Sequence, residues 1–396
     1  MKNIGLLHFL LAVIVNLSFG LGCSEKGGVD AKDSTNLSNQ IWQKLNEAET
    51  GAYTEPLSPE LLAKHKAGLS LISHKIPKGY PEPYLPYGQL KNRTLDPGLL
   101  REPVLNESLI ALGKTLFEDK SLSFSKSHGF SDAFGLSCQS CHHVEREFTD
   151  GEVLSKGIEG DFALRNTPTL WNAAYYSTLT WSNSHFPILE MQSKIPLFND
   201  DPIEMGLRGK EQEMMANLSL SDHYQSLFHS AFQVDLRESV VTGAADYTLV
   251  TQALGAFERT LIRFDSVFDL YLQGLGRLDG EAKLGASLFY GLNSLDSGQT
   301  LTCAQCHSGI LMTDSFQYVR DGVYFNKSAF HNEIRTPTLR FVAKTSPYFH
   351  DGSVNRLEDV LDFYERNGRA GAGVAQPAFT LTDGERQALL SFLNSL

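Results

Sequence analysis

Two short motifs constrain this 396-residue chain more than any other feature. Cys-Gln-Ser-Cys-His at 138–142 and Cys-Ala-Gln-Cys-His at 303–307 each carry two thiols with a histidine directly after the second. This spacing is typical of c-type haem attachment, in which two thiols bond to the haem and the histidine binds the iron. A redox-active cysteine pair needs no such histidine, and a four-cysteine zinc site leaves both histidines unexplained. We predict two covalent c-type haems, held by Cys138, Cys141, His142, Cys303, Cys306 and His307.

The two motifs lie within longer matching segments. Leu-Gly-Lys-Thr-Leu-Phe (112–117) precedes the first motif, and Leu-Gly-Ala-Ser-Leu-Phe (284–289) precedes the second. Arg-Asn-Thr-Pro-Thr-Leu (165–170) follows the first, and Arg-Thr-Pro-Thr-Leu (335–339) follows the second. Similar segments in the same order indicate an internal duplication. We therefore predict two cytochrome c-like units with one haem each.

The apolar pattern predicts a mainly α fold. Large apolar residues recur at helical spacing over 109–116, 249–264 and 357–364, and the second of these segments is expected to form a long linking helix. Thr382 and Glu385 have the spacing of a capping box at the start of a C-terminal helix. No segment alternates clearly enough to predict a sheet.

Composition excludes some classes of function. The chain has 34 Lys and Arg against 46 Asp and Glu, a net charge of −12, and no block of basic residues. Nucleic-acid binding therefore lacks its usual electrostatic footprint. An acidic surface suits a basic protein partner but does not identify one.

The N-terminus is typical of an exported protein. Lys2 precedes an apolar run over 4–19, so residues 1–22 are predicted to be a signal peptide. Cys23 follows small residues, as in a bacterial lipoprotein; cleavage nearby without lipidation and a retained membrane anchor are the alternatives. All three place the protein outside the cytoplasm, in the periplasm. Residues 24–55 have few large apolar side chains and are expected to be a tether, whereas 76–104 are proline-rich and expected to be extended on the surface.

The sixth ligand of each iron separates electron transfer from chemistry. The only methionine after His307 is Met312, which is too close along the chain to reach the opposite haem face easily. A second haem with His and Met ligands is therefore disfavoured. The remaining candidates in this half are Tyr364, His331, His350 and Lys344.

From about residue 76 to 396, the chain resembles the bacterial di-haem cytochrome c peroxidase and MauG family. The likeness rests on the features above, together with Ala-Phe-Glu-Arg-Thr-Leu (256–261) and Ser-Pro-Tyr-Phe-His-Asp-Gly (346–352), in the same order. It implies two mainly α, cytochrome c-like domains, of which the N-terminal one carries the peroxidatic haem. The expected boundaries are a signal peptide at 1–22, a tether at 23–75, an N-terminal domain at 76–265 and a C-terminal domain at 266–396.

Two positions make the chain resemble MauG-type proteins in particular. In this family the spacing from Pro347 places the distal ligand of the C-terminal haem at Tyr364, where the peroxidase members carry Met. An anionic tyrosinate oxygen would stabilise ferric and higher oxidation states. A removable distal His of the peroxidase members corresponds to Ile158 here, so we expect an open, five-coordinate N-terminal haem. His128 and His143 are the other histidines that could ligate it.

The resemblance also implies catalytic residues. Glu204 corresponds to the carboxyl that moves a proton between the two peroxide oxygens, with Gln192 as a hydrogen-bond partner. Trp181 corresponds to a tryptophan between the haems. On sequence alone, Glu204 also fits an exposed carboxylate at a helix start, and Trp181 fits a core aromatic. The family's Ca²⁺ between domains would be bound here by Asn166, Thr345 and Pro347.

These features predict an exported enzyme that reduces hydrogen peroxide at the haem of His142, with electrons relayed through the haem of His307. The electrons would come from a small redox protein, such as a cytochrome c or a cupredoxin. The alternative is MauG-like oxidation of side chains in a partner protein. A pure electron carrier is a further alternative, as is a haem-based sensor or a structural lipoprotein, and the resemblance allows for a homodimer.

Overall fold

The computed structural model describes residues 31–47, 53–85, 105–244, 246–331, 333–371 and 374–396. The predicted signal peptide and Cys23 lie outside these ranges, as does most of the proline-rich segment. Among the helices of the described ranges, none is long and apolar enough to cross a membrane.

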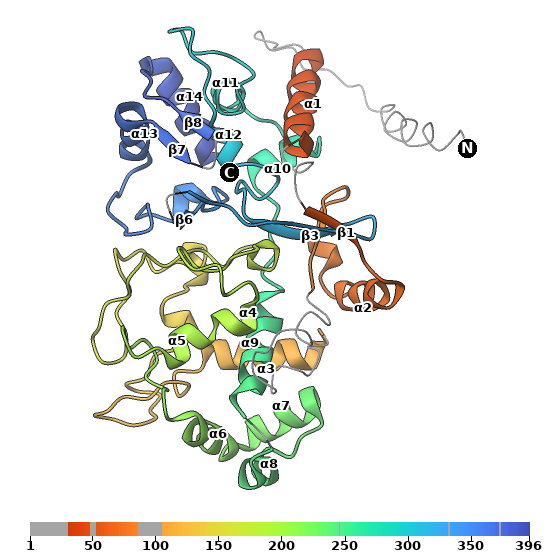
Figure 1. The fold of residues 1–396 in the computed structure, drawn as a ribbon, viewed down its shortest axis with the longest axis vertical. Helices are drawn as coiled ribbons and strands as arrows, with labels where there is room; N and C mark the ends of the chain where they lie inside the picture. Colours follow the sequence, from red (N-terminus) through yellow and green to blue (C-terminus); the bar gives the residue numbers. More distant parts are fainter. Residues whose placement is uncertain (1–30, 48–52, 86–104, 245, 332, 372–373) are drawn as a thin grey trace, which may run out of the picture.

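The described chain forms two helical halves, stacked along the long axis of the molecule (Figure 1). The lower half contains α3 (Glu107–Glu118), α4 (Leu189–Gln192), α5 (Lys194–Phe198), α6 (Glu211–Ser219), α7 (Asp222–Phe232), α8 (Leu236–Thr242) and α9 (Tyr247–Glu258). The upper half contains α10 (Val267–Leu272), α11 (Gly280–Phe289), α12 (Cys303–Cys306), α13 (Leu357–Asn367), α14 (Asp383–Asn394) and, from the N-terminal segment, α1 (Ala31–Glu47). The fold is therefore mainly α, as predicted.

A pair of tightly packed helices organises each half. A Cβ added at Gly113 of α3 would lie 1.8 Å from the backbone oxygen of Ala253 on α9. A Cβ added at Gly285 of α11 would lie 1.9 Å from the backbone oxygen of Ala388 on α14. Each glycine of the repeated Leu-Gly segment therefore allows two helix backbones to approach closely.

Three of the predicted helices are confirmed. Helices α3 and α13 cover the periodic segments 109–116 and 357–364. The capping box predicted for α14 is present, with Thr382 and Glu385 each accepting a backbone N–H of the other. The linking helix is shorter than predicted: α9 ends at Glu258, and the backbone then turns, with Thr260 N–H donating to the Phe257 oxygen.

The prediction of a tether is wrong for residues 31–47. This segment forms α1, whose Ile41 and Leu45 are buried and whose Trp42 Nε1 donates to the backbone oxygen of Leu272 at 3.0 Å. A few apolar residues at helical spacing are sufficient here because they pack against α10 and α11 instead of forming a core of their own. Helix α2 (Pro59–Leu69) follows, capped by Ser58.

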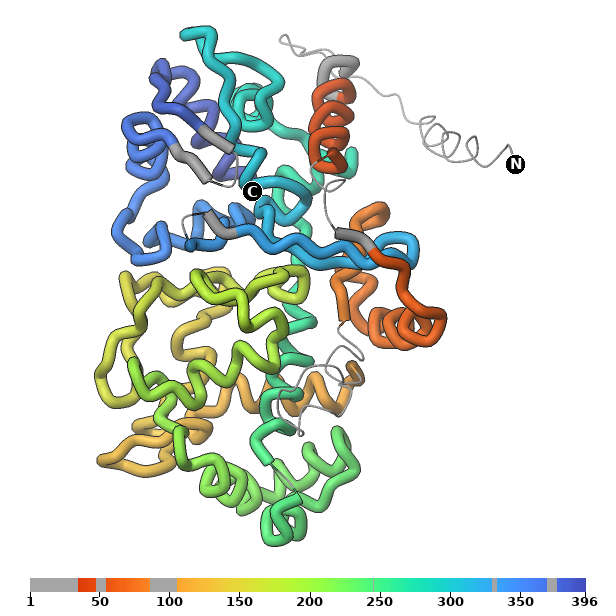
Figure 2. Tube along the Cα trace, in the orientation of Figure 1, coloured from red at the N-terminus to blue at the C-terminus, as the bar shows by residue number. Residues whose placement is uncertain are grey.

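A small sheet that the sequence did not predict joins the N-terminal segment to the upper half. Its strand order is β1-β4-β3-β2, with every neighbouring pair antiparallel. Four of the five residues of β3 are buried, so the apolar alternation of a one-sided strand is absent. Figure 2 shows the N-terminal segment lying beside the hairpin of the C-terminal half. The strands are β1 (Tyr53–Pro56), β2 (Glu82–Pro83), β3 (Phe316–Arg320) and β4 (Val323–Lys327).

Candidate haem centres and the contact between them

The first Cys-x-x-Cys-His motif begins in a short 3-10 helix (Cys138–Ser140) next to α3. Burial raises the pKa of Cys138, and burial together with the charge of Asp150 raises that of Cys141 to about 11. Among the described residues, Cys138, Cys141, Cys303 and Cys306 form no disulfide.

A backbone carbonyl fixes the orientation of His142. Its Nδ1 lies 2.8 Å from the backbone oxygen of Phe148, and burial lowers the pKa of the imidazole. Phe148 has a positive φ of 58°, which forms part of the turn that returns its carbonyl to the histidine. A neutral imidazole whose Nδ1–H donates to a carbonyl binds metal through Nε2.

The second motif repeats this arrangement. His307 Nδ1 lies 3.2 Å from the backbone oxygen of Pro337 and 3.3 Å from that of Met312, which has a φ of 53°. The sulfur of Met312 accepts a hydrogen bond from the Tyr290 hydroxyl at 3.3 Å. Burial raises the pKa of Cys303 to about 12. Both motifs thus supply thiols and an oriented imidazole, the donor set of a c-type haem.

The structure brings Glu204 and Ile158 together beside the first motif. Ile158 N–H donates to the backbone oxygen of Glu204 at 2.8 Å, and the Glu204 carboxylate acts electrostatically on Cys141. The Glu204 side chain is half-buried, and burial raises its pKa. The residue is therefore not the exposed carboxylate of a helix start. Gln192 ends α4, and α5 directly after it binds the Glu204 segment through Met205 N–H and the Pro196 oxygen at 2.9 Å.

Two buried glutamates that were not predicted from the sequence, Glu190 and Glu258, lie near the same motif. Glu190 on α4 forms a bidentate ion pair with Arg259, with distances of 2.5 and 2.8 Å, and both side chains are buried. Glu258 is buried beside this pair, and its charge acts on Cys138. Burial and the charge of Glu190 raise the pKa of Glu258 to about 8. The adjacent Glu258 and Arg259 were visible in the sequence, but the sequence did not indicate that Arg259 would form its ion pair with the distant Glu190.

Trp181 lies where the two halves meet. Its Nε1 donates to the backbone oxygen of Asn166 at 2.7 Å, and its own backbone oxygen accepts Arg335 N–H at 2.8 Å. The ring centroid lies 6.5 Å from that of His350, in an edge-to-face arrangement. Trp181 thus belongs to the N-terminal half and contacts two segments of the C-terminal half.

The residues predicted to bind Ca²⁺ lie in segments that meet at the same boundary. Asn166 N–H donates to the backbone oxygen of His350 at 2.9 Å, three residues beyond Pro347 in the chain. The Asn166 side-chain amide donates to the backbone oxygen of Glu152 at 2.9 Å. Thr345 donates through its hydroxyl to Val342. These contacts join the segments but do not test a cation.

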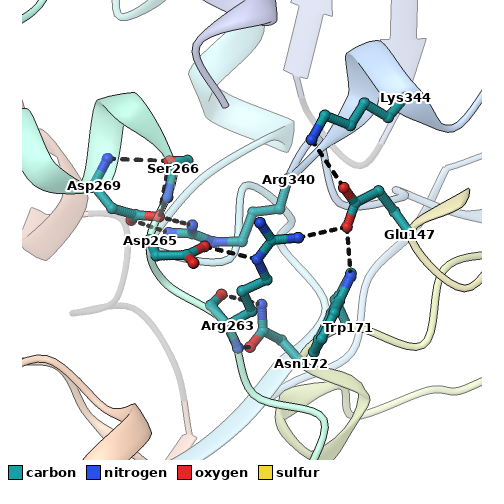
Figure 3. A network of polar contacts seen from close by, with 9 residues as sticks. All are labelled: Glu147, Trp171, Asn172, Arg263, Asp265, Ser266, Asp269, Arg340 and Lys344. Carbon is teal, nitrogen blue, oxygen red and sulfur yellow. Dashed lines mark hydrogen bonds and ion pairs between the residues drawn. The ribbon is translucent and has the colours of Figure 1, made fainter. Parts of the chain in front are cut away.

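A polar network ties the halves together on one side of this boundary (Figure 3). Glu147, next to Phe148 in the chain, accepts Trp171 Nε1 at 2.8 Å, Arg263 Nη1 at 2.6 Å and Lys344 Nζ at 3.1 Å. Burial alone would raise the pKa of Glu147, but hydrogen bonds from Lys344 and Trp171 and the charge of Arg263 lower it overall. The Arg263 guanidinium also lies over the Trp171 ring, 5.4 Å from its centroid.

A second ion pair in the same view lies inside the C-terminal half (Figure 3). Arg340 binds Asp269 through both terminal nitrogens, at 2.6 and 2.9 Å, and Ser266 donates to the same carboxylate. Arg340 Nε also donates to the backbone oxygen of Ile310, close to His307 in sequence. This pair holds α10 against the loop that follows the second motif.

The structure does not test the predicted sixth ligands of the irons, but it places several of the candidate side chains. Tyr364 is partly buried on α13 and packs against the core, and its role as a ligand stays a prediction. Lys344 is engaged by Glu147, and His128 stacks on Phe134 with ring centroids 4.0 Å apart. His350 faces Trp181, while the side chain of His331 lies outside the described part of the chain.

Comparisons with known proteins agree with this geometry. Residues 107–277 match the sequence family described as di-haem cytochrome c peroxidase. The methylamine utilization protein MauG of Methylorubrum extorquens is 30% identical over 306 residues, covering 74% of this chain and 79% of its own. The cytochrome c551 peroxidase of Pseudomonas aeruginosa is 30% identical over 315 residues, covering 75% of this chain and 81% of its own.

A solved structure is similar in fold as well. The crystal structure of a MauG-like protein associated with microbial copper homeostasis superposes with a TM-score of 0.64. It is 30% identical, and the match covers 81% of this chain and 94% of that chain. The similarity therefore extends over both helical halves.

Proposed function

This chain belongs to the family of MauG and the di-haem cytochrome c peroxidases, and from that membership we propose that it reduces hydrogen peroxide at a haem held by His142. The observation that carries the proposal is the repeated pair of thiols and carbonyl-oriented imidazole at both motifs. The duplication read from the sequence supports the same assignment, with one haem in each of two cytochrome c-like domains, 76–265 and 266–396.

Peroxide reduction needs a proton relay as well as an iron. When bound, the haem supplies an iron that binds peroxide and a path for electrons into the O–O bond. Glu204 would accept a proton from one peroxide oxygen and return it to the other, so that this second oxygen can leave as water once electrons are supplied. With two electrons and two further protons, one peroxide becomes two waters. Burial raises the pKa of Glu204, so its carboxylate accepts a proton more readily than that of an exposed glutamate, as a relay requires, and Gln192 is proposed to orient the peroxide by a hydrogen bond.

Electrons are proposed to enter through the haem of Cys303, Cys306 and His307 and to cross by way of Trp181. The position of Trp181, in contact with both halves, supports this route. Tyr364 is proposed as the distal ligand of the second iron. The Ca²⁺ assigned to Asn166, Thr345 and Pro347 would bridge the halves at the same place.

The proposed location is the periplasm. The apolar segment over 1–22 and Cys23 support export and lipid anchoring. Thioether attachment of c-type haems outside the cytoplasm agrees with export. Mass spectrometry of the mature N-terminus tests lipidation of Cys23, because a lipidated cysteine would be its first residue.

One observation favours a MauG-like reaction, in which a partner protein supplies the electrons from its own side chains. Ile158 occupies the position of the removable histidine, and its backbone is bonded to the segment that carries Glu204. An apolar side chain there cannot ligate the iron, so peroxide would react without prior reduction. Steady-state turnover with a reduced cytochrome c or cupredoxin would favour the peroxidase reading, whereas oxidation of a co-expressed protein without such turnover would favour the MauG-like one.

Spectroscopy of the oxidised holoprotein tests the proposal directly. One high-spin and one low-spin haem, and an immediate reaction with one equivalent of peroxide, are expected. If both haems are low-spin and the protein reacts with peroxide only after one haem has been reduced, the first haem is not open and needs reductive activation. Two low-spin haems that never react with peroxide would leave only an electron carrier.

A further inference from the structure

The described part of the chain contains three arginines that are almost completely buried: Arg259, Arg335 and Arg340. Arg259 and Arg340 each bind a buried carboxylate through two nitrogens. Arg335 is 3% exposed, yet its Nε and Nη1 have no hydrogen-bond partner among the described residues. A buried guanidinium without a counter-ion is strongly unfavourable, so the missing partner is expected to be an anion.

Among the described residues, the contacts of the Arg335 guanidinium are with aromatic faces and not with a carboxylate. Its guanidinium carbon lies 5.1 Å from the centroid of the Tyr176 ring and 5.9 Å from that of Trp181. Burial lowers its pKa, opposed by Tyr176, and no acidic side chain contributes. These rings hold the planar guanidinium in place and leave its edge nitrogens for a ligand in the plane.

The position of Arg335 in the fold indicates which anion could lie close to its guanidinium. It forms the end of β6 (Ile334–Arg335), at the boundary of the halves (Figure 1). Two residues later, the Pro337 oxygen accepts His307 Nδ1 at 3.2 Å, and between them the Thr336 oxygen accepts the hydroxyl of Thr313 at 2.7 Å. The segment that begins at Arg335 therefore lines the centre of the second motif.

We propose that Arg335 binds a propionate carboxylate of the haem attached at Cys303 and Cys306. The inference rests on the haem attachment proposed above and adds a specific anchor to it. A guanidinium and a carboxylate form two parallel hydrogen bonds, which would pair Nε and a terminal nitrogen with the two propionate oxygens. The same contact ties the second haem to Tyr176 and Trp181 of the other half.

Three variants of the holoprotein test this anchor: R335Q, R335K and, as a control, R277Q, which removes an exposed arginine of the same half. Potentiometric titration followed by EPR reports the two irons separately, and resonance Raman reports the propionate bending bands. In R335Q the uncompensated propionate is expected to shift the reduction potential of the second haem downward and to move its propionate band. R335K keeps the positive charge but cannot form the two parallel hydrogen bonds of a guanidinium. It should keep the reduction potential of the second haem near the wild-type value and still move the propionate band. R277Q should change neither.

The outcomes separate this inference from the proposed function. Absence of two haems by pyridine haemochrome assay would overturn haem attachment and this inference together. Two haems with unchanged potentials and propionate bands in both R335Q and R335K would overturn the anchor alone. A wild-type potential that varies with phosphate or chloride, with unmoved propionate bands in the variants, would assign Arg335 to a dissolved anion instead. If R335Q does not fold, the band shift in R335K decides.

Discussion

At the scale of single residues, the histidine of each motif, His142 or His307, has its Nδ1 within hydrogen-bond distance of a backbone carbonyl, so the polypeptide path itself orients the imidazole. The two histidines were predictable because their spacing to cysteine is local in sequence. Their acceptors were not, because they depend on left-handed residues, Phe148 and Met312, that carry large side chains. Arg335 was also missed, since an arginine without a partner has no sequence signature.

Glu204→Gln tests the proton relay. An amide keeps the size of the carboxyl but cannot accept the peroxide proton, so we expect kcat for peroxide reduction to fall by about 10²–10⁴-fold. The wild-type rate should decline as pH falls through the raised pKa of Glu204, at higher pH than an exposed glutamate would give, because only the carboxylate accepts a proton. Stopped-flow kinetics between acid and neutral pH measure both effects. A variant with unchanged rate and unchanged haem content would remove Glu204 from the mechanism.

Ile158→His tests the open first haem. If position 158 corresponds to that of the removable histidine, as proposed above, a histidine there would bind the iron, so we expect the high-spin signal to be replaced by a low-spin one and the reaction with peroxide to require prior reduction. The Ile158→Val variant keeps an apolar side chain and should behave like wild type. Optical and EPR spectra of the oxidised proteins provide the measurement, and an unchanged high-spin signal in the histidine variant would contradict the assignment.

At the scale of elements, helices with a strong apolar face were predictable and short or docked elements were not. Apolar residues at helical spacing predicted α3, α13 and α14, and a capping box also predicted the start of α14. The apolar spacing predicted a helix that continues past the observed end of α9 at Glu258, because buried residues such as Leu261 keep the same spacing although the backbone there forms a turn. The sheet and α1 depend on contacts with distant segments, which local patterns do not encode.

Gly113→Ala and Gly285→Ala test the two helix crossings. Each new methyl would meet a backbone oxygen, which cannot move aside as a side chain could, so we expect a loss of about 1–3 kcal/mol in unfolding free energy. Gly280→Ala at the start of α11 meets no atom within 4 Å and should be neutral or stabilising by less than about 1 kcal/mol. Thermal denaturation of the holoproteins compares the three. Equal stability of all three variants would mean that the crossings relax without cost.

At the scale of the whole molecule, the two halves are joined by charges as well as by apolar contacts. Glu147 comes from the loop beside His142, Arg263 from the connection between the halves, and Lys344 from the C-terminal half. Because Glu147 is next to the residue that orients His142, a change in the packing of the halves would be felt at the first motif.

Glu147→Gln tests this coupling. Removing the negative charge leaves Lys344 and the Trp171 indole without the carboxylate they bind and Arg263 with only the exposed Asp265, and we expect a loss of about 1–3 kcal/mol at neutral pH. The folded-state pKa of Glu147 is lowered, so its contribution is present above the unfolded pKa and is lost as pH falls through the folded value. The difference between wild type and variant should therefore shrink in acid. Denaturant unfolding at neutral and acidic pH measures it.

Asp265→Asn provides the matched control for this prediction. Asp265 binds the same arginine at 2.7 Å, but its side chain is 61% exposed, so its removal should cost less than about 1 kcal/mol at any pH. A loss in this variant as large as that in Glu147→Gln would show that Arg263, and not the buried carboxylate, carries the effect.

The sheet order has a consequence for solubility. Strands β1 and β2 come from residues 53–83 and flank both sides of the β3–β4 hairpin, which lies in the last third of the chain. An unpaired strand edge is a template for association with another molecule. Strands β1 and β2 therefore cover the two edges of a hairpin that follows more than 200 residues later in the sequence. A protein from which residues 53–85 are removed by proteolysis would be expected to aggregate through the exposed edges of β3 and β4, even with both haems in place.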